Sequence, residues 1–448
     1  MEETTNKKKL YIETYGCQMN VADSEVVVSL MQDQGYEVTR KMEEASLILV
    51  NTCSIRENAE QRVWGRLDVF RQQKQKHPGI RIGVIGCMAE RLKEQLIEKE
   101  KAVDLVIGPD AYRALPTLLE GVEAGQKGVN TLLSKEETYG DIAPIRTGNN
   151  NLSAFISIMR GCNNMCSYCI VPYVRGRERS RDPHTIFREV GELSEAGFRE
   201  VTLIGQNVDS YQWKGPDGEK VTFDALLEQA AQVDENMRIR FATSHPKDLS
   251  DRVLQVMARY PNICRHIHLP VQSGSSRILQ AMNRGYTREW YLNRIEAIKH
   301  YLPDAAITTD IMTGFCGETE EDHRQTLSLM EKAGYDFAYM FKYSERPGTK
   351  AARRMEDDVP EEVKKRRLNE IIELQNTLST RSKELALDHT YTVLVEGVSK
   401  KSAVEYHGRN SQNQVVVFPV ENAQPGDLVK VQVHKATPAT LIGKQVKS

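Results

Sequence analysis

Short apolar runs alternate with longer amphipathic stretches from about residue 9 to residue 109. The runs that predict strands cover residues 10–14, 47–51, 80–85 and 103–107. Alternation of this kind is typical of a parallel sheet covered by helices. We therefore expect an N-terminal α/β domain over residues 8–125. A stretch richer in Gly, Asn and charge, from about residue 133 to residue 151, predicts a linker.

A second alternating series follows the linker. Its apolar runs cover residues 154–159, 201–204, 239–243, 266–269, 307–311 and 337–341, and a helical pattern follows each of them. Six β/α units are too few for a closed eight-stranded barrel. We expect an open partial (β/α)6 barrel over residues 148–380, with its chemistry in the loops at the carboxyl ends of the strands.

The last part of the chain changes character. Residues 361–388 predict one long charged helix with an apolar stripe, which we expect to bridge two domains. Short β-like runs at residues 391–398, 404–406, 415–420, 428–433 and 441–446 are separated by turn residues. Five such strands indicate a small β-barrel of the oligonucleotide-binding sort over residues 383–446. The fold class is thus α/β and multidomain.

Charge and composition narrow the function classes. The 448 residues include 60 Lys and Arg against 62 Asp and Glu, a formal net charge of −2. No overall field therefore draws the protein onto nucleic acid or an anionic membrane, and any RNA contact needs a local patch. No apolar run reaches the roughly 18 residues of a spanning helix, and the first residues are polar. We expect a cytoplasmic protein, without membrane contact, whose eight cysteines are reduced.

Three of these cysteines form a compact motif. Cys162, Cys166 and Cys169 directly follow the first strand of the partial barrel. Their thiolates can wrap one [4Fe-4S] cluster and leave one iron open, which for this spacing S-adenosylmethionine (SAM) is known to occupy. A structural zinc site is the alternative, but it wants four ligands in paired short spacings. The spacing favours the cluster, and in this β/α context the chain resembles a radical SAM enzyme.

Three further cysteines are far apart in sequence. Cys17, Cys53 and Cys87 each follow a predicted strand by one to three residues. Because the carboxyl ends of parallel strands emerge at one edge, the three thiols should be gathered there. This predicts a second cluster with an open iron. Three unrelated buried cysteines are the alternative, since free Cys is often buried.

The resemblance then sharpens to the methylthiotransferase family of radical SAM enzymes. It rests on residues 11–20 (YIETYGCQMN), residues 51–57 (NTCSIRE), the three-cysteine motif and the tail, which looks like a TRAM domain. The resemblance implies two [4Fe-4S] clusters and SAM as cofactors. Residues 18–20 and 54–57 resemble the branch that modifies tRNA more than the branch that modifies an aspartate of a ribosomal protein.

The resemblance also implies an activity. Such an enzyme would put a methylthio group on C2 of N6-isopentenyladenosine at position 37, in the anticodon stem-loop of tRNA. One SAM would methylate a sulfur held on the auxiliary cluster, and a second would yield the radical that activates the substrate carbon. We expect a monomer that needs an electron donor and a sulfur donor, neither of which the sequence identifies. Two alternatives stay open: a ribosomal-protein substrate, and a non-catalytic iron–sulfur RNA-binding protein.

Polar residues at strand ends are candidate cofactor contacts. By resemblance these are Gln206, Ser244, Gln272 and Asp310. Turn chemistry explains Ser, Gly and Pro at such places equally well. Cys316 stands where the family commonly has proline, and we expect it and Cys264 to be core residues.

Arginines alternate just after the cysteine motif. Arg175, Arg177 and Arg179, with Arg181 beyond them, could grip phosphates of a substrate or a cofactor carboxylate. A solvated charged loop is the alternative. No residue is identified as a general acid or base.

Overall fold

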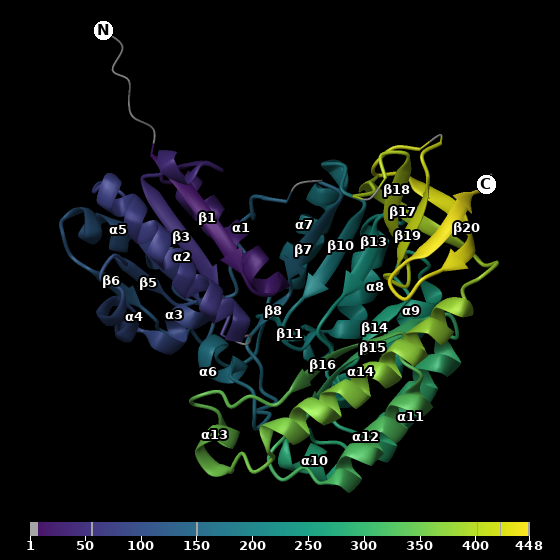
Figure 1. The fold of residues 1–448 in the computed structure, drawn as a ribbon. Coiled ribbons are helices and arrows are strands. Elements are labelled where there is room, and N and C mark those ends of the chain that lie inside the picture. The colour runs from purple at the N-terminus through teal and green to yellow at the C-terminus, as the bar shows by residue number, and fades with distance from the viewer. Residues whose placement is uncertain (1–7, 55–56, 149–150, 401, 422, 447–448) are drawn as a thin grey trace.

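The computed structural model describes residues 8–54, 57–148, 151–400, 402–421 and 423–446. Figure 1 shows three parts in chain order: an N-terminal sheet domain, a larger middle unit and a C-terminal barrel that sits against the middle unit. The α/β multidomain class predicted from the pattern is confirmed. Ile55 and Arg56, part of the second segment that carries the family resemblance, lie outside the described residues.

The N-terminal domain is a six-stranded parallel sheet in the order β2-β1-β3-β4-β5-β6. Its strands are β1 (Lys9–Tyr15), β2 (Glu37–Val38), β3 (Leu47–Thr52), β4 (Arg81–Gly86), β5 (Leu105–Ile107) and β6 (Gly128–Asn130). Its helices are α1 (Gln18–Gln32), α2 (Glu57–Lys76), α3 (Cys87–Leu92), α4 (Glu94–Lys99) and α5 (Leu115–Glu123). Strand β3 is buried throughout, because Leu47 and Leu49 enter one core while Ile48 and Val50 enter the other.

The middle unit contains the six predicted parallel strands. They form two sheets, β13-β10-β7 and β14-β15-β16, which a parallel bridge between Ile239 and Ile263 connects. The strands are β7 (Ser153–Ser157), β10 (Glu200–Ile204), β13 (Arg238–Phe241), β14 (His266–His268), β15 (Ala306–Thr313) and β16 (Phe337–Lys342). The helices are α6 (Val171–Arg175), α7 (Pro183–Glu195), α8 (Phe223–Val233), α9 (Asp251–Arg259), α10 (Ser276–Ala281), α11 (Arg288–Tyr301), α12 (Glu320–Ala333), α13 (Lys350–Arg354) and α14 (Glu361–Glu384). Two antiparallel pairs, β8 (Met159–Arg160) with β9 (Arg179–Ser180) and β11 (Gln212–Lys214) with β12 (Lys220–Thr222), lie beside the sheets.

Alternation along the strands separates a core from a polar interior. On β10, Val201 and Leu203 belong to the hydrophobic core of the middle unit, while Glu200 and Thr202, which alternate with them, are buried polar residues. On β13, Ile239 and Phe241 likewise enter that core, and Arg238 and Arg240, which alternate with them, do not. Because successive side chains point to opposite faces of a strand, the inner face of the partial barrel is polar along β10 and β13.

The C-terminal strands close into a barrel, β17-β18-β19-β21-β20. They are β17 (Thr390–Val398), β18 (Glu405–Asn410), β19 (Val415–Pro419), β20 (Leu428–Ala436) and β21 (Leu441–Gln445). Arg238 and Arg240 of β13 reach out of the middle unit to the turn after β18. Arg240 donates to the carbonyls of Asn410 and Ser411 at 2.7 and 3.0 Å, and Arg238 donates to that of Arg409 at 2.9 Å. Charged hydrogen bonds to backbone carbonyls therefore fix the barrel on the middle unit.

The predicted linker is not a free tether. Tyr139 is 3% exposed, and its ring stacks on Tyr112 with centroids 5.6 Å apart. The carbonyls of Ser134 and Glu137 accept hydrogen bonds from Arg179. One buried aromatic ring and two hydrogen-bonded carbonyls therefore pack this predicted linker between the domains that it connects.

None of the helices described is long and apolar enough to cross a membrane.

We predict that Arg240→Met loosens the barrel and leaves the middle unit folded. Both carbonyls lose a charged donor, and each such bond contributes about 1.5–3 kcal/mol. Hydrogen–deuterium exchange should rise in the turn after β18. Arg259→Met is the matched control, because that arginine is 68% exposed in an ion pair with Glu228. Unchanged exchange in the turn of Arg240→Met would contradict this role.

Candidate active site

Three cysteines lie at the carboxyl edge of the N-terminal sheet. Cys17 follows β1, Cys53 follows β3, and Cys87 is the first residue of α3 directly after β4. These strands are neighbours, and their register pairs the last residue of β1 with that of β3, and that of β3 with that of β4. The strand ends therefore form one row, and each thiol follows it within one or two residues.

The three thiols lie within range of one another's charge. A hydrogen bond with Cys53 lowers the pKa of the Cys17 thiol to about 6. Burial raises the pKa of Cys87, and the Cys17 charge acts in the same direction. The Cys87 Sγ also accepts a hydrogen bond from Arg175 Nε at 3.2 Å. The three thiols that follow the strand ends thus lie close together, with the Arg175 guanidinium beside them.

Buried amides hold the loops that carry these thiols. Asn20 Nδ2 donates to Asn51 Oδ1 at 2.9 Å and to the Thr52 carbonyl at 3.2 Å. Gly86 has φ +90°, and a Cβ there would collide with Asn51 Oδ1. Only glycine fits such a position without strain. The backbone before Cys87 is therefore fixed by sterics and by hydrogen bonds together.

The second set of thiols shares one loop between β8 and α6. The Cys169 N–H donates to the Cys166 carbonyl at 3.0 Å. Burial raises the pKa of Cys162 to about 11 and that of Cys169 to about 12, and the charge of Cys166 adds to both shifts. Gly161 before the motif has φ +77°, and a Cβ there would collide with the Arg177 carbonyl. The three thiols converge on one poorly solvated site.

Residues far along the chain hold this loop in place. Ser167 N–H donates to the Met282 carbonyl at 2.9 Å, and the Ser167 carbonyl accepts from Ala351 N–H at 2.7 Å. Arg284, which is 5% exposed, donates through Nη1 to Cys166 Sγ at 3.3 Å. Each set thus has one thiol in contact with a buried guanidinium: Arg175 contacts Cys87 in the first set, and Arg284 contacts Cys166 in the second.

One buried carboxylate connects the two sets. Asp23 of α1 is 1% exposed and accepts hydrogen bonds from Arg160 Nη1 and Arg175 Nη2, both at 2.8 Å. Arg160 lies two residues before Cys162, and Arg175 also contacts Cys87. Burial favours the neutral acid, but the two guanidiniums hold the pKa of Asp23 below its ordinary value. This ion triad joins the N-terminal domain to the loop that carries Cys162, Cys166 and Cys169, which is called the cluster loop below.

The three candidate arginines have different surroundings. Arg175 and Arg179 are buried, and Arg179 Nη2 donates to Asp110 Oδ1 at 2.9 Å. Arg177 is exposed. Two of the three guanidiniums predicted to grip phosphates are thus already paired with carboxylates inside the protein. Phosphate binding stays a prediction for Arg177.

Polar atoms without partners gather at the ends of β10 and β13. Gln206 Oε1 and both ring nitrogens of His245 are buried without a hydrogen-bond partner among the described residues. Ser244 is 5% exposed beside His245. Lys247 of the same segment donates to Asn164 Oδ1 of the cluster loop at 2.5 Å. Because buried polar atoms are nearly always satisfied, these fit a polar ligand next to the cluster loop.

The other two predicted cofactor contacts lie on neighbouring segments. Gln272 N–H donates to the Asp310 carbonyl at 2.9 Å, and Asp310 Oδ1 lies 3.4 Å from His268 Nε2. Gln272 and Thr243 have φ +73° and +74°. A positive φ of this size lies in the left-handed region of backbone conformation. Residues other than glycine store strain there, and such strain concentrates at functional sites. The structure brings the two segments together, and their cofactor roles stay a prediction.

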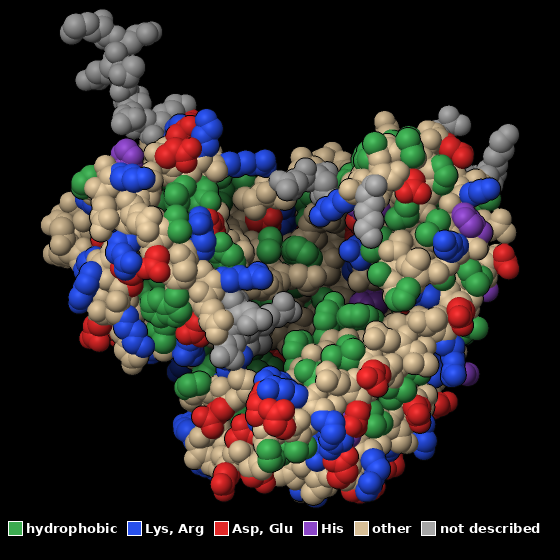
Figure 2. Space-filling view, viewed as in Figure 1, with side chains coloured by type: hydrophobic (Ala, Val, Ile, Leu, Met, Phe, Trp, Pro, Cys, Tyr) green, Lys and Arg blue, Asp and Glu red, His purple; other side chains and the backbone are tan. Residues whose placement is uncertain are grey.

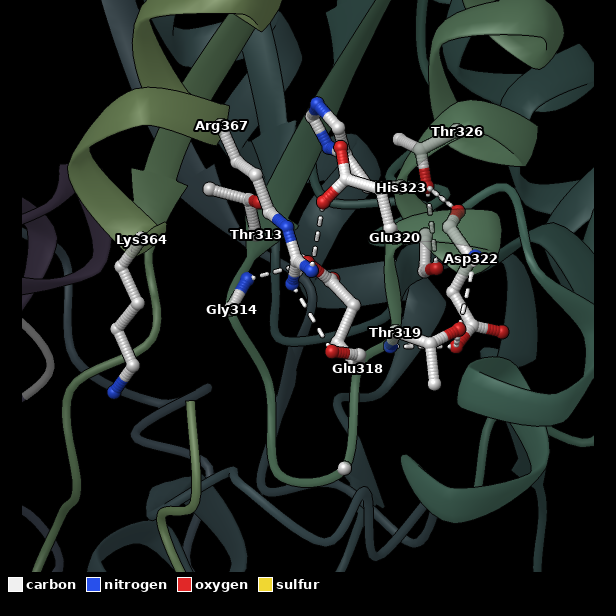
Figure 3. Close-up of polar contacts among 12 residues, drawn as sticks. Thr313, Gly314, Glu318, Thr319, Glu320, Asp322, His323, Thr326, Lys364 and Arg367 are labelled. Carbon is white, nitrogen blue, oxygen red and sulfur yellow. Dashed lines mark hydrogen bonds and ion pairs between the residues drawn. The ribbon is translucent and has the colours of Figure 1, made fainter. Parts of the chain in front are cut away.

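The loop after β15 is held by helix α14 (Figure 3). Glu318 Oε1 accepts hydrogen bonds from Gly314 N–H at 2.9 Å, Thr313 Oγ1 at 3.2 Å and Arg367 Nη1 at 2.9 Å. Gly314 has φ +70°, and a Cβ there would collide with the stem of Lys364. The loop that follows the candidate cofactor contact Asp310 is therefore clamped from outside the barrel.

The donor sets fit two iron–sulfur clusters. All eight cysteines are free thiols, and the six discussed above form two sets of three without a fourth cysteine ligand. Cys264 lies near the amino end of β13, and Cys316 is buried among apolar side chains. No group of three or more His, Cys, Asp or Glu side chains in the described ranges is arranged around a single metal ion. Three thiolates at one buried site suit a cluster with an open iron.

Sequence reasoning missed three charged residues of this site. Arg160 lies two residues before Cys162, so its place beside the cysteine motif was a usable signal. Asp23 lies on α1 after Cys17, and nothing local distinguishes it from a solvated helix carboxylate. Arg284 contacts Cys166 across 118 residues, a separation that no spacing rule covers.

Family models match three parts of the chain. Residues 9–108 match a family described as "Uncharacterized protein family UPF0004", residues 156–330 match the radical SAM superfamily, and residues 389–446 match the TRAM domain. The first two matches contain both sets of cysteines.

Curated relatives match nearly the whole chain. A tRNA-2-methylthio-N(6)-dimethylallyladenosine synthase of Bacteroides thetaiotaomicron is 59% identical over 441 residues, which covers 98% of this chain and 97% of the relative. Proteins of the same name from Bacteroides fragilis and Amoebophilus asiaticus are 58% and 56% identical, covering 99% and 98% of this chain and 97% and 93% of the relatives.

Solved structures resemble the fold. The radical S-adenosylmethionine methyltransferase TsrM from Kitasatospora setae, with cobalamin and a [4Fe-4S] cluster bound, has a TM-score of 0.60 at 14% identity. The match covers 77% of this chain and 77% of that chain. A second structure, with tryptophan and a SAM analogue bound, has a TM-score of 0.59 at 14% identity and covers 77% and 75%. At this identity the likeness concerns the fold alone.

We predict that Asp23→Asn lowers the free energy of unfolding by about 3–5 kcal/mol, because two buried guanidiniums lose their counter-charge. Denaturant titration measures this loss. Since the folded-state pKa of Asp23 lies below its unfolded value, the carboxylate stabilises the fold at neutral pH, and the difference from wild type should shrink as pH falls below about 4.

Glu123→Gln is the matched control for this experiment. Glu123 pairs with Lys8 at 2.9 Å, and both side chains are about half exposed. Removing such a surface pair costs less than about 1 kcal/mol. A loss that small for Asp23→Asn would show that the domain junction does not depend on the triad.

Proposed function

This chain belongs to the tRNA-2-methylthio-N(6)-dimethylallyladenosine synthase family of radical SAM enzymes, and we propose that it puts a methylthio group on C2 of N6-isopentenyladenosine at position 37 of tRNA. The observation that carries this proposal is the high identity to the named relatives across all three domains. The arrangement of the two thiol sets agrees with it, since the reaction needs a radical generator and a sulfur carrier close together.

The proposal assigns two [4Fe-4S] clusters and SAM to the site. Cys162, Cys166 and Cys169 would hold the cluster that binds SAM. The row of Cys17, Cys53 and Cys87 would hold the auxiliary cluster that carries the sulfur. When bound, these groups supply the electron, the radical chemistry and the transferred methylthio group.

The protein's own residues position the parts. Asp23 fixes the two cysteine loops relative to each other through Arg160 and Arg175, and Arg284 holds the Cys166 thiol. Such pre-organisation raises the rate, because the reacting groups need not be brought together during the reaction. Cys53, Cys87 and Cys166 are buried, and this partial burial of both sets limits the access of water to reactive species.

The remaining polar residues form the proposed SAM subsite. Gln206 and Ser244 follow β10 and β13 beside the cluster loop, and their polar groups would meet the amino-acid part of SAM. Gln272 and Asp310, on the facing sheet, would meet its nucleoside part. The unpartnered Gln206 Oε1 supports this assignment.

The proposed partner is the anticodon stem-loop of tRNA. A TRAM match, a small closed barrel and an exposed Arg177 support an RNA surface. Small β-barrels bind single-stranded loops by stacking and backbone contacts, without a high net charge. A cytoplasmic location, a monomeric state and separate electron and sulfur donors complete the proposal.

The two alternatives have less support. A ribosomal-protein substrate or a non-catalytic role would leave the identity to tRNA enzymes unexplained. Mass spectrometry of nucleosides tests all three, after anaerobic incubation of isopentenylated tRNA with reconstituted protein, SAM, reductant and sulfide. Methylthio product on the modified adenosine supports the proposal. Intact clusters that yield no methylthio product would contradict it.

We predict that Cys17→Ala abolishes the methylthio product and spares SAM cleavage. Cys17 belongs to the proposed sulfur-carrying set, and the radical-generating set is untouched. The two readouts are methylthio nucleoside and 5′-deoxyadenosine, measured in the same reaction.

Two variants bracket this result. Cys162→Ala should abolish both products, because it removes a ligand of the SAM-binding cluster. Cys264→Ala removes a buried thiol outside both sets and should keep both. Full methylthio product from Cys17→Ala would overturn the assignment of the auxiliary cluster.

A further inference from the structure

Three aromatic side chains are exposed in a row on β16. Phe337, Tyr339 and Phe341 are 45%, 49% and 43% exposed. Because side chains alternate along a strand, all three share one face. In the described part of the chain, Trp290 is the only other comparably exposed aromatic side chain. A contiguous exposed apolar patch of this kind marks a binding surface more often than a single exposed residue does.

This aromatic stripe lies on the inner face of the partial barrel. The intervening residue Ala338 packs into the core of the middle unit behind the sheet. The parallel register pairs Tyr339 with Asp310 of β15. His268 contacts both, with its ring centroid 5.8 Å from that of Tyr339 and its Nε2 3.4 Å from Asp310 Oδ1. The stripe is therefore continuous with the proposed SAM subsite.

The stripe is also open to a large substrate. β16 is the last strand of its sheet and pairs only with β15 among the described strands. A six-stranded barrel leaves that edge unclosed. Figure 2 shows a hollow between the three parts of the molecule, and hydrophobic side chains gather on its wall in the region of β15 and β16. A base turned out of an RNA loop can enter from this side.

We propose that Phe337, Tyr339 and Phe341 form the subsite for the adenine ring and N6-isopentenyl group of the tRNA substrate, an assignment that rests on the proposed function. Aromatic faces stack on bases in proteins that bind single-stranded RNA. The isopentenyl group is a bare hydrocarbon and gains free energy by leaving water against an apolar surface.

The length of the stripe favours a base with an attached hydrocarbon over a base alone. A strand rises about 3.3 Å per residue, so the stripe extends about 13 Å from Phe337 to Phe341. One purine ring covers only part of that length. The Phe337 and Tyr339 rings pack edge to face, with their centroids 5.0 Å apart, so they present a continuous apolar surface.

The test compares two anticodon stem-loops, one with N6-isopentenyladenosine and one with plain adenosine at position 37. Direct binding to the full-chain protein gives the preference as a ratio of two Kd values. The wild type should prefer the isopentenylated RNA. Tyr339→Ala and Phe341→Ala should each reduce that preference about tenfold, because each removes apolar surface against which the isopentenyl group is buried. Tyr339→Phe should retain it.

Trp290→Ala is the matched control, because it removes the other exposed aromatic side chain and should leave the preference unchanged. An unchanged preference in Tyr339→Ala would overturn the subsite. Equal weakening of both RNAs would show a general stacking surface and overturn the isopentenyl assignment. Methylthio product is measured on the wild type in parallel. Absence of that product would contradict the proposed function, and with it the isopentenylated base as occupant of the subsite. The two failures can therefore be told apart.

Discussion

The buried carboxylate of Asp23 is the constraint on which the site depends. It lies on the N-terminal domain, yet both of its guanidinium partners flank the cysteine loop of the middle unit. A buried ion pair adds little net stability, but it is costly to break, so it favours one arrangement over nearby alternatives. The two thiol sets are therefore held at one separation by an interaction that tolerates little slippage between the domains.

Buried charge plays a similar part elsewhere in the middle unit. Arg238 and Arg240 use backbone carbonyls of the barrel as partners, and Arg367 on α14 uses Glu318 on the loop after β15. Each arginine side chain reaches from one element to another. Its hydrogen bonds are directional, so they fix the relative position of the two elements more closely than an apolar contact would. The partial barrel has two strands fewer than a closed eight-stranded barrel. The hydrogen bonds of these arginines supply part of the rigidity that a closed barrel gains from a continuous ring of strand pairs.

The sequence predicted what local patterns encode. Buried strands such as β3 read as continuous apolar runs, and the thiols follow from short spacings after strand ends. β2 and β6 have only two and three residues, too short for any periodicity to register. The partners of Cys87 and Cys166 could not be predicted either, because Arg175 and Arg284 reach them across 88 and 118 residues. Local spacing thus located the thiols, and tertiary packing alone supplied the charges beside them.

The burial of Arg175 and Arg179 changes where RNA affinity must originate. A chain with a net charge of −2 has no overall attraction for phosphates, and these two guanidiniums are already paired with Asp23 and Asp110. Electrostatics can then contribute only through exposed groups such as Arg177, and the remainder must come from stacking and apolar contact. An enzyme whose substrate is an already prenylated base gains selectivity from this balance. Phosphate contacts would hold modified and unmodified tRNA equally, whereas an apolar surface beside the cofactor distinguishes them.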